Sequence, residues 1–66
     1  MVKNRLKEIR MREYMENGKE FCNRLGIAQS TYSPIELNRQ QGTAETMFKI
    51  ARALDRNVED IWYWED

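Results

Sequence analysis

Residues Lys19–Asn38, KEFCNRLGIAQSTYSPIELN, decide the fold of this chain, and Gly26 lies at the centre of the stretch. Before Gly26, the apolar residues Phe21, Cys22 and Leu25 recur at helical spacing, which gives a short helix one apolar face. A glycine just past the last apolar residue can adopt the left-handed conformation that ends a helix without a Cβ clash. The pattern therefore predicts a helix that ends at Leu25 and a turn at Gly26.

A second helical pattern begins near Gln29, where Tyr32 and Ile35 lie three residues apart and face inward. Two short helices joined by a three- or four-residue turn that contains glycine make a helix-turn-helix unit, whose second helix enters the major groove of DNA. The alternative is an ordinary hairpin of two helices, which many helical bundles contain.

The outward face of the second helix favours DNA binding over this alternative. Its residues are almost uncharged, whereas a solvated helix face usually carries Glu and Lys. Glutamine can make a bidentate contact with adenine, and serine can hydrogen-bond to several bases. We therefore expect the base-reading residues to be Gln29, Ser30, Thr31 and Ser33.

The segments LGIAQSTYSPIE and ETMFKIARALDRNVEDIW resemble the Cro and lambda-repressor class of helix-turn-helix transcriptional regulators, also called the XRE type. The resemblance runs from Arg5 to the end of the chain. It implies an all-α, compact five-helix domain of the lambda-repressor type, in which helices two and three form the helix-turn-helix. Residues 1–66 are then a single DNA-binding domain.

Capping residues and apolar spacing outline the remaining helices. Asn4 can cap the first helix, Thr43 the fourth and Asn57 a short fifth one. The spacing predicts these inward residues: Val2, Leu6 and Ile9 in the first helix, Met47, Ile50, Ala51 and Leu54 in the fourth, and Val58, Ile61 and Trp62 in the fifth.

Composition restricts the function further. With 41% hydrophobic and 33% charged residues, the chain is typical of a small folded domain. A single Cys and no His cannot form an internal disulfide or a zinc site, so we expect no metal and no cofactor. Without a signal-like run or a long apolar segment, the sequence indicates a soluble protein of the reducing cytoplasm with no membrane partner.

The net charge of zero hides an uneven distribution. Residues 1–42 carry 8 Lys and Arg against 5 Asp and Glu, and residues 43–66 carry 3 against 6. The two parts therefore have net charges of +3 and −3, and the helix-turn-helix lies in the positive part. This asymmetry fits a domain with one face toward DNA.

The resemblance also implies roles for charged and loop residues. In related repressors, an arginine at the place of Arg10 pairs with a glutamate at the place of Glu36, so we expect a scaffold pair that fixes the angle of the recognition helix. For each arginine assigned to phosphate, the alternative is a solvated surface residue. The expected phosphate-binding residues are Arg5, Gly18, Lys19, Asn38 and Arg39. At Gly18 and Lys19 the expectation rests on the backbone amides of a helix N-terminus, which can bind a phosphate.

Two stretches depart from the family pattern. Residues 11–18, MREYMENG, are one residue longer than the usual loop, with Tyr14 and Met15 as core contacts and Asn17 either ending the first helix or capping the second. Gly18 replaces a glutamine that commonly binds phosphate. Pro34 falls inside the recognition helix, where it predicts a kink or break, so either only the first turn enters the groove or the surface serves something other than DNA.

The ending Trp62-Tyr63-Trp64 predicts an interface, because three consecutive aromatic residues cannot all face the core of so small a domain. In related small repressors the last helix meets its symmetry mate. A homodimer would set two recognition helices about one DNA turn apart, roughly 34 Å. The expected interface residues are Ile61, Tyr63 and Trp64.

The sequence thus predicts a transcriptional regulator, most simply a repressor, that binds a palindromic double-stranded DNA operator as a homodimer. The alternative is a protein-interaction module on the same fold, antitoxin-like or anti-repressor, with weakened DNA readout. Catalysis is not expected, because there is no His, no Gly-rich phosphate loop and no nucleophile with a candidate base. No small-molecule ligand is expected in a domain of this length.

Overall fold

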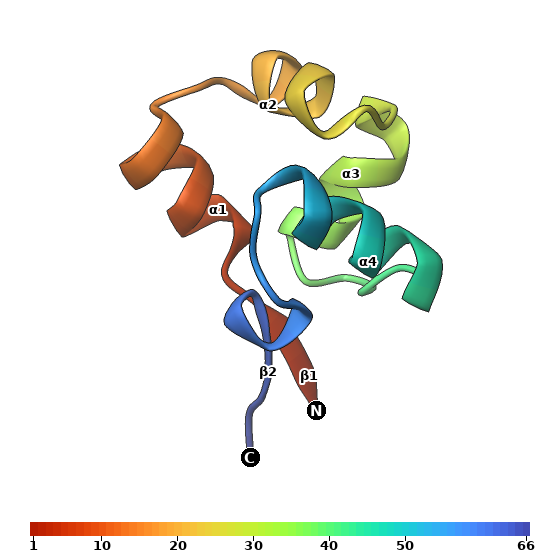
Figure 1. Ribbon diagram of the computed structural model, residues 1–66. Coiled ribbons are helices and arrows are strands. Elements are labelled where there is room, and N and C mark those ends of the chain that lie inside the picture. The colour runs from red at the N-terminus through yellow and green to blue at the C-terminus, as the bar shows by residue number, and fades with distance from the viewer.

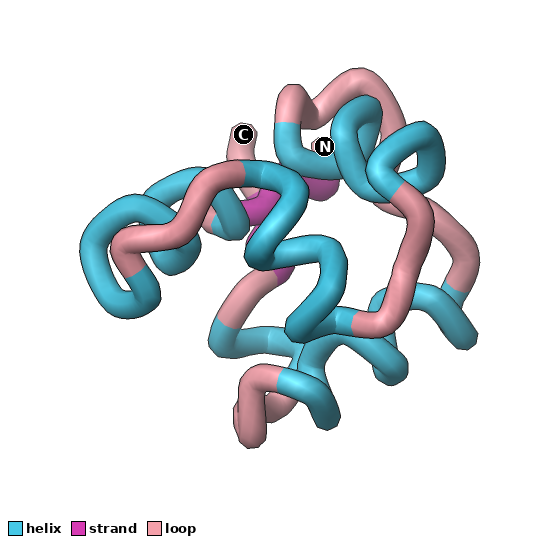
Figure 2. Tube along the Cα trace, turned by 90° about the horizontal axis from the view of Figure 1, so that it is seen from above, coloured by secondary structure: helices cyan, strands magenta, loops and turns pink.

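The computed structural model describes all residues from Met1 to Asp66. Helices make up most of the chain, and its two ends form one small antiparallel sheet (Figure 1, Figure 2). In chain order, the elements are β1 (Val2–Asn4), α1 (Leu6–Ile9), a π-helical segment (Arg10–Tyr14), α2 (Gly18–Leu25), α3 (Gln29–Glu36), α4 (Ala44–Ala53), a 3-10 turn (Val58–Asp60) and β2 (Trp62–Trp64). None of these helices is long and apolar enough to cross a membrane.

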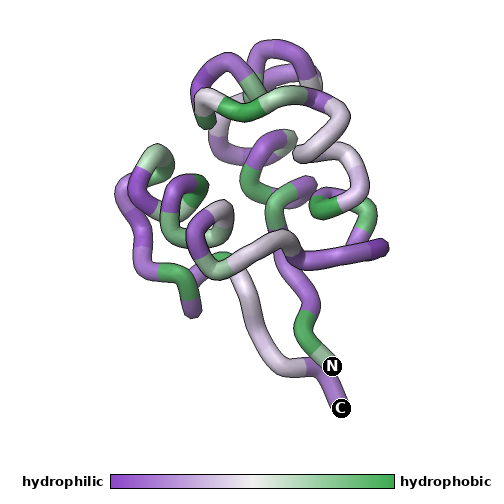
Figure 3. Tube along the Cα trace, turned by 90° about the vertical axis from the view of Figure 1, so that its right-hand side faces the viewer, coloured by the Kyte–Doolittle hydropathy of each residue, from purple (hydrophilic) through white to green (hydrophobic).

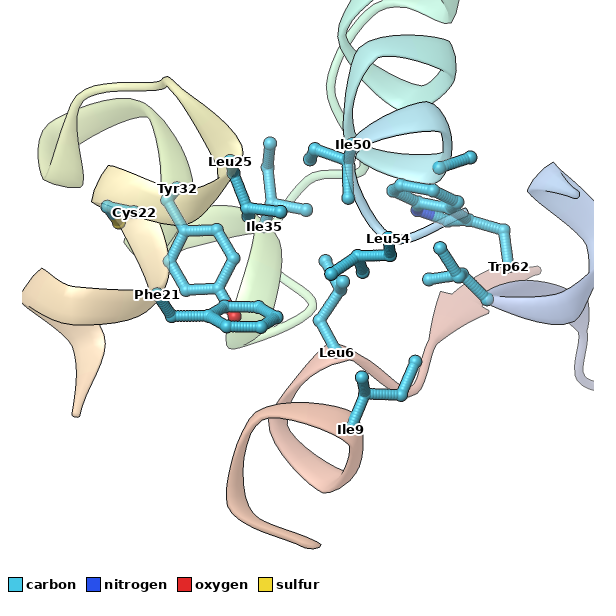
Figure 4. Close-up of a cluster of buried hydrophobic side chains, with 12 residues drawn as sticks. Leu6, Ile9, Phe21, Cys22, Leu25, Tyr32, Ile35, Ile50, Leu54 and Trp62 are labelled. Atoms are coloured by element: carbon cyan, nitrogen blue, oxygen red, sulfur yellow. The ribbon is translucent and has the colours of Figure 1, made fainter. Parts of the chain in front are cut away.

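One hydrophobic core lies between the four helices and β2 (Figure 4). The rings of Phe21 and Tyr32 meet edge to face at its α2–α3 side, with centroids 5.7 Å apart. Helical spacing predicts all twelve buried apolar residues as inward: Leu6, Ile9, Phe21, Cys22, Leu25, Tyr32, Ile35, Ile50, Ala51, Leu54, Ile61 and Trp62. The core prediction is therefore confirmed for every one of these positions.

The ends of the helices follow local signals in the sequence. Asn17 caps α2 in a capping box: its Oδ1 accepts from the Glu20 N–H at 2.9 Å, and Glu20 Oε1 accepts from the Asn17 N–H at 2.9 Å. Gly26 ends α2 in the left-handed conformation at φ 72°. Thr43 Oγ1 accepts from the Thr46 N–H at 3.2 Å and caps α4. Of the two roles left open for Asn17, the structure shows the cap of the second helix.

The first helix continues as a π-helical segment before the chain reverses at Met15. A π turn holds one residue more than an α turn, so it takes up the extra residue in this part of the sequence. Tyr14 packs against Phe21 with ring centroids 5.5 Å apart, as expected of a core contact. Met15 is 82% exposed, so its prediction as a core residue is wrong. It lies at the reversal itself, in the left-handed conformation at φ 51°.

The prediction of an all-α domain with five helices is wrong at the C-terminal end. After the single 3-10 turn, β2 pairs with β1 in the register Val2 with Trp64, Lys3 with Tyr63 and Asn4 with Trp62. Trp and Tyr favour an extended, half-buried strand, so this segment pairs with β1 in place of continuing as a helix. The two ends of the chain consequently lie side by side, away from the helices (Figure 3).

Val2 is part of this sheet and exposed, so it is not an inward residue of the first helix. Asn4 also belongs to β1, although its Oδ1 still accepts from the Leu6 N–H at 3.1 Å.

The predicted break at Pro34 is absent, because α3 runs through Pro34 to Glu36. Only two helical residues follow the proline, so the missing N–H removes one hydrogen bond near the end of the helix.

Candidate nucleic-acid interface

The outward face of α3 begins directly after the turn that joins it to α2. Its N-cap residue, Ala28, has no side-chain oxygen to cap the helix. The Ala28 carbonyl accepts from the N–H groups of Thr31 and Tyr32, while those of Gln29 and Ser30 have no partner in the protein. The first turn of α3 therefore presents open backbone donors, in contrast to the side-chain-capped starts of α2 and α4.

The four residues predicted to read bases all lie exposed on α3. None of their side chains makes a hydrogen bond within the protein, so their polar groups are free for a partner. They are Gln29, Ser30, Thr31 and Ser33. On the opposite face of the helix, Tyr32 and Ile35 are buried in the core and hold it in place.

A charged group holds the C-terminal end of α3. Arg10 Nε donates to Glu36 Oε1 at 2.8 Å and Arg10 Nη2 to Glu36 Oε2 at 3.2 Å, so the pair is bidentate. Tyr32 Oη donates to Glu36 Oε1 at 2.6 Å, and Arg10 Nη1 donates to the Glu16 carbonyl at 2.9 Å. The two residues named by the family pattern thus meet across the domain and join the first helical segment to α3.

These contacts determine the protonation states of Glu36 and Tyr32. Burial by itself raises the pKa of Glu36, but the hydrogen bonds from Arg10 and Tyr32 outweigh it and lower the pKa below its usual value. Burial and the bond to Glu36 raise the pKa of Tyr32, so its hydroxyl keeps the proton that it donates. At neutral pH the group is therefore an ion pair with a bound phenol.

The N-terminus of α2 lies next to the start of α3. The N–H groups of Gly18 and Lys19 have no partner in the protein, because the capping box binds only those of Asn17 and Glu20. A Cβ on Gly18 would lie 4.0 Å from Nε2 of Gln29. The predicted phosphate positions Gly18 and Lys19 therefore lie beside the predicted base-reading residue Gln29.

The other predicted phosphate positions lie near the chain ends and the loop after α3. The Arg5 guanidinium lies over the ring of Tyr63, 4.6 Å from its centroid. Arg5 and Asn38 both line a surface groove of about 520 Å³. Arg39 is exposed and has no ion-pair partner.

Asn38 differs from the expectation in where its side chain points. Its backbone is left-handed at φ 60°, as a residue that ends a helix often is. Its amide, however, binds β1: Oδ1 accepts from the Asn4 N–H at 2.9 Å and Nδ2 donates to the Asn4 carbonyl at 3.4 Å. A side chain held in this way has few groups left for phosphate. Asn4 itself was not a predicted site residue, and no pattern in the sequence links two residues 34 positions apart.

The unpaired charge around the helix-turn-helix is positive. Each of the five acidic residues in positions 1–42 is already bonded: four in ion pairs and Glu20 in the capping box. The basic residues in the same positions without an ion pair are Lys3, Arg5, Lys7, Lys19 and Arg39. Five free cations therefore remain available to phosphate groups.

A protein-family model described as helix-turn-helix matches residues 6–61 of the 66-residue chain. The chain belongs to the Cro and lambda-repressor family of helix-turn-helix proteins. This is the XRE-type family that the sequence resembles, and its members are DNA-binding transcription regulators, typically without enzymatic activity. A comparison with curated proteins gave no match. No His, Cys, Asp and Glu side chains of this helix-turn-helix protein are grouped to hold a metal ion.

The C-terminal residues predicted for a dimer interface differ in their exposure. Ile61 is 0% exposed, so its assignment to an interface is wrong: its side chain is already used in the core. Tyr63 is half-buried beside Arg5, and Trp64 is 69% exposed, with Nε1 donating to Asp66 Oδ1 at 3.0 Å. Trp62 and Trp64 lie on one face of β2, and only Trp62 reaches the core.

Proposed function

We propose that this helix-turn-helix protein is a repressor that binds a palindromic DNA operator as a homodimer. The observation that carries the proposal is the exposed face of α3, where four polar, uncharged side chains make no hydrogen bond within the protein. In the free protein, water solvates these side chains. In a complex, hydrogen-bonding groups of this kind match the edges of bases in the major groove.

In this proposal the first turn of α3 reads sequence. Gln29 makes a bidentate contact with an adenine, and Ser30, Thr31 and Ser33 add contacts along the same groove wall. The open N–H groups of Gln29 and Ser30 favour a nearby phosphate oxygen, because they lie at the positive end of the helix. Since Pro34 leaves α3 unbroken, the helix can lie in the groove along its full length.

The backbone contacts come from around the recognition helix. The free N–H groups of Gly18 and Lys19, with the Lys19 ammonium, bind a phosphate on one side, and Arg39 binds one on the other. Arg5 contributes from the start of α1. Asn38, whose amide is bound to β1, acts through the position of its neighbour Arg39 and not through its own side chain.

The homodimer rests on β2 in place of the predicted fifth helix. Hydrogen bonds between Met1 and Glu65 and between Arg5 and Ile61 flank the ladder, so the N–H and C=O groups of Trp64 face away from β1. A second copy that adds its own β2 antiparallel to this edge would pair those groups and cover part of Trp64. One strand pairing with its own copy closes a two-fold dimer.

The function is tested by selecting binding sites from a pool of random duplex DNA and measuring affinity at two salt concentrations. We expect the enriched sequences to contain two inverted half-sites whose centres lie about one helical turn apart. Enrichment of no sequence, with weak binding that disappears at higher salt, would instead indicate nonspecific contact. A protein partner recovered in place of DNA would support the interaction-module alternative.

A further inference from the structure

Asn4 is the one polar side chain buried in this domain, at 5% exposure. Its Nδ2 donates to the Ile35 carbonyl at 2.7 Å, and its Oδ1 accepts from the Leu6 N–H at 3.1 Å. Ile35 lies in the last turn of α3, whose carbonyls have no partner within the helix, and the Asn38 N–H shares the same carbonyl at 3.0 Å. Asn4 therefore joins the N-terminal strand to the C-terminal end of the recognition helix.

The bonds continue into the loop after α3 and into β2. Asn4 Nδ2 also donates to Gln41 Oε1 at 2.7 Å, and the indole Nε1 of Trp62 donates to the same oxygen at 3.1 Å. Gln41 Nε2 donates to Asn38 Oδ1 at 3.1 Å, and that oxygen also accepts from the Asn4 N–H. We call Asn4, Asn38, Gln41 and Trp62 the Asn4 cluster. Every buried side-chain N or O atom in the protein has a partner.

Two residues of the Asn4 cluster, Asn38 and Gln41, flank Arg39 in the sequence. Arg39 follows Asn38 and precedes Gln41 by two residues, and its side chain is exposed without an ion pair. The loop between α3 and α4 has no regular structure, so the amides of Asn38 and Gln41 are its ties to the strands. The Arg39 N–H donates to the Pro34 carbonyl at 3.0 Å, which joins its backbone to the end of α3, and the cluster joins the same loop to β1 and β2.

We propose that Asn4 is a positioning residue for DNA binding: through Asn38 and Gln41 it fixes the loop that presents Arg39 beside the recognition helix. The inference rests on the proposed function, because it assigns Arg39 to phosphate. A satisfied buried amide network specifies one geometry, since breaking one bond leaves other buried groups without partners. The cluster also ties β2, the proposed dimer strand, to the loop on the DNA side.

Asn38→Gly separates this role from folding. Glycine adopts φ 60° without strain, so the substitution removes the amide contacts with Asn4 and Gln41 while it keeps the backbone conformation. Met15→Gly is the matched control, because Met15 also has a positive φ, is exposed and lies outside the cluster. Both changes add the same flexibility to the unfolded chain, which thermal unfolding measures.

The first readout needs no DNA. In ¹H–¹⁵N spectra of the free protein, the Trp62 indole N–H reports on Gln41, and the Trp64 indole N–H, bonded to Asp66, is an internal reference. We expect Asn38→Gly to shift the Trp62 indole signal and to speed hydrogen exchange at the Asn4 amide, with the Trp64 signal unchanged. Asn4→Ala removes the Nδ2 donor to Gln41 Oε1 and keeps the backbone N–H of residue 4, so it should shift the Trp62 indole signal without that exchange effect, and Met15→Gly should do neither. An unchanged Trp62 signal in both cluster variants would overturn the proposal.

The second readout is a double-mutant cycle on DNA affinity with Arg39→Ala. If the cluster positions Arg39, this substitution costs less in the Asn38→Gly background than in the wild-type chain, by roughly threefold to tenfold in Kd. Equal losses in the two backgrounds would overturn the positioning role and leave the cluster as a structural tie. A wild-type chain that binds no DNA would refute the proposed function, and the spectra would still show whether the loop depends on Asn4.

Discussion

Arg10 and Glu36, 26 residues apart, form a bidentate ion pair that joins the first helical segment to the end of α3. Both side chains are largely shielded from solvent. The Glu36 carboxylate is held by Arg10 and Tyr32, so we expect the pair to act on DNA binding through the direction of the helix. The same carboxylate also binds the Tyr32 hydroxyl, which makes it the anchor of the C-terminal half of the recognition helix.

We expect Glu36→Gln to lower the free energy of unfolding at pH 7 by about 1–2 kcal/mol, because Arg10 then lacks its anionic partner. The pKa of Glu36 is lowered in the folded state, so its contribution is present above its unfolded pKa and is lost as the pH falls through the folded value. Urea unfolding at pH 7 and pH 3 should show the difference from wild type shrinking at the lower pH. Glu8→Gln, in an exposed pair with Arg12, is the control and should change little at either pH.

We expect Gln29→Ala to weaken operator binding by ~1–3 kcal/mol and to relax the preference at one base position. Binding-site selection repeated with the variant measures both effects. Asn23→Ala, an exposed amide on α2, should leave the preference unchanged. Equal loss on operator and random DNA would show that Gln29 does not read a base.

Arg39→Ala should weaken binding to every sequence alike and reduce the slope of log K against log salt by about 1, since one phosphate contact is lost. Titrations at four salt concentrations give the slope. Arg52→Ala removes one exposed charge from α4 and is the control for net charge. A loss confined to the operator would assign Arg39 to a base instead.

Pro34→Arg should leave the fold intact and increase affinity for random DNA, because it adds a charge on the recognition helix. The half-exposed position and the unbroken helix leave room for a long side chain. Pro34→Ala restores the helical N–H without the charge, so comparing the two variants by circular dichroism and DNA titration separates helix stability from electrostatics. An unfolded Pro34→Arg chain would mean that the proline ring is required for packing.

Trp64→Ala should shift the protein toward monomer and reduce operator affinity more than random-DNA affinity, because only the operator needs two aligned recognition helices. Sedimentation at micromolar concentrations measures the shift. Phe48→Ala removes another exposed aromatic side chain, from α4, and should not change the mass in solution. A wild-type monomer at high micromolar concentration would contradict the dimer.

The sequence predicts the core and the helix-turn-helix because both depend on local periodicity and on single capping residues. Gly26, Asn17 and Thr43 each act within one or two turns, so their roles can be read from neighbours. The C-terminal strand could not be predicted in this way, since Trp62–Trp64 adopts its conformation by pairing with Val2–Asn4 at the other end of the chain. The error at Val2 follows from that missed pairing.

The same limit applies to the site. The Arg10–Glu36 contact was expected because the family pattern names both positions, and the exposed α3 residues because helical spacing orients them. The Asn4 cluster joins residues 34 and 37 positions apart through amides, and neither hydrophobic spacing nor charge marks such a group. From the sequence alone, an asparagine that is buried in the fold cannot be distinguished from an asparagine that caps a helix.

The pairing of β1 with β2 makes each strand depend on the other. In a chain without Trp62–Trp64, β1 has no strand to pair with, and Gln41 lacks the indole of Trp62. The signals that start and end the helix-turn-helix, residues 18–36, lie within or directly beside that segment. We therefore expect proteolytic removal of β2 to loosen the loop after α3 before it unwinds the recognition helix.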